Sequence, residues 1–114
     1  MSRGIKILPE PLRILDYTQL TSSYVALGTA FLHPMSVCIF KNVYNIPVLI
    51  SWDGVSDDDY MPSNSSFVLD VTANKTQSQG LFTAKGTQIY IKQYGGSAAT
   101  SGIFSLTCLY SSLV

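Results

Sequence analysis

The chain has 114 residues, of which 46% are hydrophobic and 12% are charged, and its formal net charge is zero. This length suits a single domain with one core. The charged fraction is about half that of an average globular protein, and the balanced charge gives no support to a polyanion-binding role. A surface so poor in charge suits a subunit covered by its neighbours, and it equally suits a β-rich monomer.

Charge is segregated along the chain. Residues 1–41 carry a net charge of +2, residues 42–74 carry −5 and residues 75–114 carry +3. Complementary fields of this kind can orient copies of a chain head to tail, because they set register between subunits. Compensation within one molecule is the alternative explanation.

The first 23 residues are predicted to form an extended N-terminal arm. Pro9 and Pro11 each favour extended geometry in the preceding residue and remove a ladder donor. Leu12, Ile14 and Tyr17 are spaced too irregularly for a helix. We expect these three side chains to dock onto the body of the domain or onto a neighbouring subunit, and to contribute little to the stability of the domain itself.

Residues 24–114 are predicted to form a single all-β domain, a β-sandwich or jelly roll of seven to eight short antiparallel strands. Short apolar runs alternate with turn residues, and no long window has a helical period. The candidate strands are residues 24–32, 35–41, 46–52, 66–72, 80–84, 87–94 and 103–110. Asp53-Gly54 and Lys85-Gly86 supply tight turns between them.

Period-two alternation within these runs predicts the core. The residues expected on buried faces are Val48, Ile50, Trp52, Phe67, Leu69, Val71, Ile89, Ile91, Phe104, Leu106, Cys108 and Tyr110.

Cys38 and Cys108 are the two cysteines, and both lie in apolar strands. A single pair is not the dense disulfide framework of a small secreted domain, so buried free thiols are expected. The start of the chain does not resemble a secretory signal, and no apolar run approaches the length of a membrane span. We therefore expect a protein that is made in a cytoplasm and has no membrane partner.

Residues 53–59 form an acidic loop that contains Asp57, Asp58 and Asp59 and leads to Tyr60. Oxygen-rich loops suit hard cations, but this spacing fits no EF-hand, so a solvated turn is the preferred interpretation and no metal is expected.

His33 has no evident catalytic partner. Residues 95–102 lack the ending of a phosphate-binding loop. Tyrosines with few cations do not indicate an RNA-binding face. We expect no enzyme activity, no cofactor and no nucleic-acid partner.

Several segments together resemble small virion proteins of tailed bacteriophages. They are the strand and turn Val48–Gly54, the acidic loop ending in Tyr60-Met61-Pro62, and the strand that starts Lys85-Gly86-Thr87-Gln88. The closing strand to Tyr110 completes the pattern, which covers residues 24–110.

The resemblance implies a structural component of a phage particle that cements or decorates the capsid through contacts with other virion proteins and with copies of itself. It also implies a homo-oligomer in the assembled virion. A neck or tail adaptor is an alternative. Another alternative is a carbohydrate- or peptide-binding module in which Trp52, Tyr60 and the acidic loop form a shallow site; an exposed Trp52 would favour this module and a buried one the virion protein.

Overall fold

The structure is a computed structural model that describes residues 5–33, 35–70, 86–96 and 98–113. Within these ranges the chain is almost entirely β-structure. The elements are β1 (Ile5–Pro9), β2 (Arg13–Asp16), the 3₁₀ turn η1 (Tyr17–Gln19), β3 (Val25–Ala26), β4 (Val37–Asn42), β5 (Val48–Ser51), β6 (Asp59–Met61), β7 (Ser65–Asp70), β8 (Tyr90–Gln93) and β9 (Ile103–Leu113).

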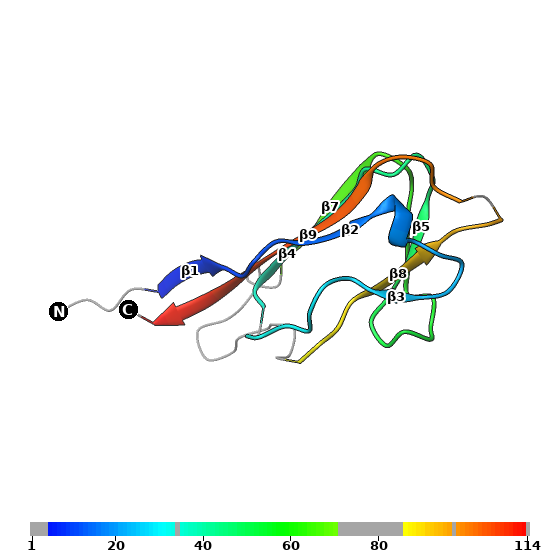
Figure 1. Ribbon diagram of the computed structural model, residues 1–114. Helices are drawn as coiled ribbons and strands as arrows, with labels where there is room; N and C mark the ends of the chain where they lie inside the picture. The colour runs from blue at the N-terminus through cyan, green and yellow to red at the C-terminus, as the bar shows by residue number, and fades with distance from the viewer. Residues whose placement is uncertain (1–4, 34, 71–85, 97, 114) are drawn as a thin grey trace.

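Two antiparallel sheets pack together as a β-sandwich, which confirms the predicted fold class (Figure 1). The first sheet has the order β1-β9-β4-β7, with β2 also paired to β9, and the second has the order β3-β8-β5-β6. β9 is the longest strand, with 11 residues. β1 and β2 lie one after the other along its edge, and β1 with the end of β9 projects away from the two-sheet body (Figure 1).

The core lies between the sheets and follows the predicted alternation. Ile89 and six strand residues expected in the core are buried, and Trp52, Phe67, Leu69 and Tyr110 are partly buried against them. Those six strand residues are Val48, Ile50, Ile91, Phe104, Leu106 and Cys108. Val71 and the candidate strand 80–84 lie outside the described residues.

Cys38 and Cys108 face each other across the β4–β9 pair, and both are buried thiols that take no part in a disulfide. The expectation of buried cysteines without a disulfide is confirmed. The hydrogen bond with Cys38 and burial both raise the pKa of the Cys108 thiol, which favours its protonated form.

The candidate strand 24–32 is reduced to Val25–Ala26. Gly28 has φ +66°, which interrupts the extended backbone after Leu27. The chain then continues as an irregular segment that remains tied to the second sheet, because the Phe31 N–H donates to the Thr87 carbonyl. The acidic loop is also shorter than expected, since Asp59 and Tyr60 belong to β6 and pair with β5.

The sequence predicted an N-terminal arm separate from the sandwich. The structure corrects this prediction, because β1 and β2 pair with β9 in the first sheet. Arg13 to Asp16 pair with Leu106 to Ile103 of β9, and Glu10, Arg13 and Leu15 are buried. Pro9 and Pro11 interrupt the ladder only between β1 and β2, where the Glu10 N–H still donates to the Cys108 carbonyl. Because β9 is long enough to pair with both strands, the segment forms an edge of its own sheet.

Candidate interaction surfaces

The N-terminal residues expected to make contacts divide between two environments. Leu12 and Ile14 are 56% and 46% exposed, whereas Tyr17 is partly buried against the core. The cause is the pleat of β2, which buries Arg13 and Leu15 and turns the alternating positions outward. Two of the three predicted contact residues are therefore exposed, and the third packs against the core next to η1.

The outer side of the first sheet carries further exposed apolar side chains. The strand register places Ile14, Ser105, Lys41 and Ser66 in one row across β2, β9, β4 and β7. The next row along β9, β4 and β7 contains Thr107, Ile39 and Val68. Val43 continues the outward positions of β4 and is 49% exposed, and Val68 is 58% exposed. We name Leu12, Ile14, Ile39, Lys41, Val43 and Val68 the apolar face.

The sequence analysis did not identify the β4 and β7 members of this face. A signal was present, since residues 37–40 are apolar at every position. Such a run is typical of a strand covered on both sides. In β4 the inward positions Cys38 and Phe40 are buried in the core, whereas Ile39 is only partly buried. The chain itself thus covers one side of β4 much more fully than the other.

The acidic loop uses its carboxylates to close turns. The pKa of Asp53 is held well below its usual range by hydrogen bonds from the Ser56 and Val55 backbone amides and the Ser51 hydroxyl. Asp58 accepts a hydrogen bond from the Trp52 backbone N–H at 2.9 Å. The bond from the Val55 N–H to Asp53 is that of an Asx turn, in which a side-chain oxygen replaces a backbone acceptor, whereas Asp58 closes the loop back onto Trp52.

Asp57 is tied to the second sheet. It accepts a hydrogen bond from the Tyr24 hydroxyl and lies 3.4 Å from Lys92 Nζ, and these contacts lower its pKa. Lys92 in turn lies 4.6 Å from the centre of the Tyr24 ring. Asp57 is therefore already paired within the chain. In the described part of the molecule, no three His, Cys, Asp or Glu side chains are grouped so that they could hold a metal ion.

Two exposed aromatic rings lie on the outer side of the second sheet. Tyr60 and Tyr94 are 47% and 51% exposed and pack edge to face with ring centres 5.1 Å apart. Val55, in the loop, is 82% exposed. We name Val55, Asp58, Tyr60 and Tyr94 the loop surface. Asp59 alternates with Tyr60 in β6 and lies on the side of that strand on which Met61 is buried. Tyr94 was not among the predicted contact residues, because an isolated tyrosine after a strand has no distinctive local pattern.

Trp52 does not belong to this surface. It is partly buried, packs against the core and meets the Phe40 ring in an edge arrangement with centres 6.2 Å apart. Its indole is therefore not available as the platform that a shallow carbohydrate or peptide site would need.

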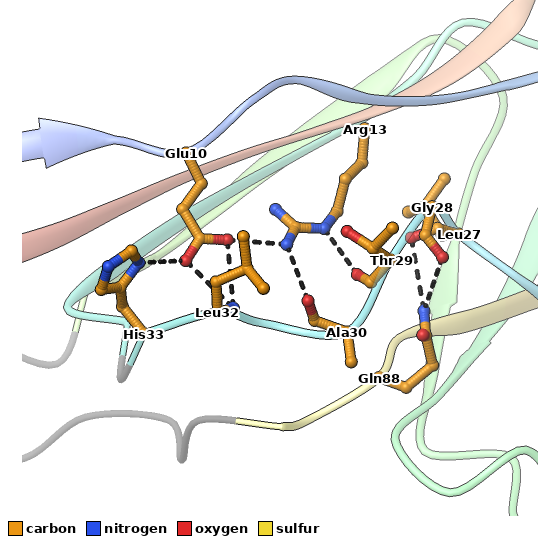
Figure 2. A network of polar contacts seen from close by, with 9 residues as sticks. All are labelled: Glu10, Arg13, Leu27, Gly28, Thr29, Ala30, Leu32, His33 and Gln88. Atoms are coloured by element: carbon orange, nitrogen blue, oxygen red, sulfur yellow. Dashed lines mark hydrogen bonds and ion pairs between the residues drawn. The ribbon is translucent and has the colours of Figure 1, made fainter.

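A buried polar network joins the N-terminal segment to the loop that precedes β4 (Figure 2). Arg13 Nη2 lies 2.7 Å from Glu10 Oε1, and Arg13 Nε donates to the Thr29 carbonyl at 2.8 Å. The second Glu10 oxygen accepts from the Leu32 N–H and lies 2.7 Å from His33 Nδ1. Burial opposes ionisation of Glu10, but the hydrogen bonds from Arg13, His33 and Leu32 outweigh it and lower its pKa.

This network assigns His33 a structural contact that the sequence analysis did not find. The imidazole stacks on the Tyr110 ring with centres 3.7 Å apart while it contacts Glu10. It thereby connects β9, the β1–β2 junction and the loop before β4. No local motif marks this contact, because its two partners lie 23 residues before His33 and 77 residues after it in the sequence.

Comparison with known proteins adds no relative: no family model, curated protein or solved structure matches this chain. Among the residues that the structure describes, no helix is long and apolar enough to cross a membrane.

Proposed function

We propose that this protein is a structural component of a phage particle, made in the host cytoplasm and incorporated into the virion, where it cements or decorates the capsid through contacts with neighbouring subunits. The observation that carries the proposal is the apolar face. Leu12, Ile14, Val43 and Val68 are all about half exposed and come from three different parts of one sheet side.

A sandwich normally turns polar residues to solvent on the outer side of an antiparallel sheet. Contiguous exposed apolar side chains on a soluble domain mark a protein contact. The small charged fraction of the whole chain and the virion-like pattern of turns and strands support the same function.

The position of Trp52 favours a virion protein over a carbohydrate- or peptide-binding module, because its ring packs on the core. The exposed Tyr60–Tyr94 pair is the feature that favours the module. Glycan-array and peptide-array binding by the purified protein tests this second function. Loss of a specific signal on Tyr60→Ala or Tyr94→Ala would support it.

Quantitative mass spectrometry of purified particles tests the proposed function. We expect the chain to copurify with the major shell protein through a density gradient, in copy numbers comparable to that protein. A few copies per particle would instead indicate the neck or tail adaptor. Recovery of the chain only in the soluble fraction of the lysate would contradict both virion positions.

A further inference from the structure

We infer that this protein associates with itself head to tail, with the apolar face of one copy docked on the loop surface of the next. The inference deepens the proposed function, on which it rests, because it names a second copy as one of the neighbours. Each surface has apolar side chains to bury, and the two surfaces differ in charge.

The distribution of exposed apolar side chains supports this arrangement. Eight large hydrophobic residues are exposed in the described part of the chain. Four belong to the apolar face, three belong to the loop surface, and Leu32 lies outside both. Docking one surface on the other buries exposed side chains of both sets, and burial of exposed apolar area is the main favourable contribution to association.

The charges of the two surfaces are complementary. Lys41 is the one charged member of the apolar face, and it is exposed. The loop surface contributes Asp58, whose side chain accepts a hydrogen bond from the Trp52 backbone N–H. Asp58 forms no ion pair with another described residue. A second copy thus offers Lys41 an acidic partner, and matched potentials favour this orientation over a contact between two apolar faces.

The placement of the surfaces requires non-equivalent contacts. The apolar face lies on the outer side of the first sheet, whereas Tyr60 and Tyr94 lie on the outer side of the second sheet. A contact between different patches of identical subunits leaves one free patch on each end of a pair. Such heterologous contacts build closed rings or filaments rather than twofold dimers.

Sedimentation velocity of the full-length protein, from micromolar to about 0.5 mM, tests the inference. We expect a concentration-dependent series of oligomers. Lys41→Glu and Asp58→Lys, each alone, place like charges in the contact and should weaken association at least about tenfold. An equimolar mixture of the two variants should associate again, because every contact between unlike variants regains opposite charges.

Val68→Gln and Leu32→Gln form a matched pair of neutral substitutions at residues of nearly equal exposure, 58% and 57%. The first should weaken association and the second should not, while circular dichroism confirms that all variants are folded. A monomer over the whole concentration range, equal behaviour of these two variants, or no recovery in the mixture would overturn the inference. Because the proposed function is tested by particle composition, a monomeric chain found in particles would refute self-association alone.

Discussion

Arg13 is the buried charge on which the N-terminal strands depend. Its side chain is 4% exposed and meets a Glu10 side chain that is 1% exposed. Removing one member of a buried pair leaves the other charge without compensation, which costs more than the pair itself contributes. Among the described residues, Nη1 of Arg13 has no hydrogen-bond partner, so the network is incompletely satisfied there.

We predict that Arg13→Met lowers the free energy of unfolding by about 3–5 kcal/mol, because it leaves Glu10 buried and without its cation. Urea denaturation followed by circular dichroism measures the change. Lys41→Met, at an exposed position, is the control and should cost less than about 0.5 kcal/mol. Adding Glu10→Gln to Arg13→Met should restore part of the loss. A cost below about 1 kcal/mol for Arg13→Met would show that the pair is not important for stability.

Gly102 enables the turn that leads into β9. Its φ is +101°, and a Cβ atom added there would lie 2.1 Å from the Val43 carbonyl oxygen. We predict that Gly102→Ala destabilises the protein by at least about 2 kcal/mol in thermal or urea unfolding, because it combines backbone strain with a backbone clash. Gly96→Ala, in the same loop, is the matched control, because a Cβ atom added there would meet no atom of the described residues within 4 Å. Equal stability of the two variants would contradict this explanation.

At the scale of elements, β9 organises the first sheet. β1 and β2 pair with one edge of it and β4 with the other. Loss of β1 and β2 would turn a central strand into an edge strand and would remove Leu15 and the Glu10–Arg13 pair from the core. The N-terminal segment therefore belongs to the fold, whether or not it also contacts a neighbouring subunit.

We predict that deletion of residues 1–16 abolishes the cooperative thermal transition or lowers the melting temperature by more than about 10 °C, since a loss of 1 kcal/mol shifts it by several degrees. Circular dichroism at increasing temperature makes the measurement. A Leu12→Ser/Ile14→Ser variant keeps the strand pairing while it changes exposed side chains, so its melting temperature should stay close to that of the original chain. An unchanged transition in the truncated chain would restore the interpretation of a separate arm.

For the whole molecule, we expect the free energy of unfolding at acid pH to depend on the carboxylates that accept hydrogen bonds only in the folded state. Glu10 has a folded-state pKa below its usual value of 4.5, and Asp53 is shifted in the same direction. A lowered folded-state pKa means that the unfolded chain binds protons first as the pH falls. The stability is fully present above the unfolded-state pKa and is lost as the pH falls through the folded-state pKa.

We therefore predict that the free energy of unfolding decreases from about pH 5 downward, as urea denaturation at a series of pH values would show. Glu10→Gln should make this dependence shallower, because the substituted amide does not titrate. Stability that rises on acidification, or an equally steep dependence in Glu10→Gln, would contradict the role of this carboxylate.

The sequence by itself determined the all-β class and most of the core, because period-two alternation and turn residues are local signals. Ile50, Leu106 and Cys108 could be assigned to buried faces in this way. It also identified part of each candidate surface, through Leu12 and Ile14 on the apolar face and Asp58 and Tyr60 on the loop surface. It could not identify Val68 as a member of the apolar face or Tyr94 as a member of the loop surface.

Only the tertiary structure decided which strands are neighbours. Local sequence shows that residues 5–16 are extended, but their partner is a strand about 90 residues later, and that choice follows from long-range packing. The same holds for His33, whose contacts to Glu10 and Tyr110 exist only once β1, β2 and β9 are in place. Exposure, too, depends on how the sheets pack. Cys38 and Ile39 are both apolar neighbours in β4, and Cys38 is buried because the second sheet covers its side of the strand, whereas Ile39 stays partly exposed.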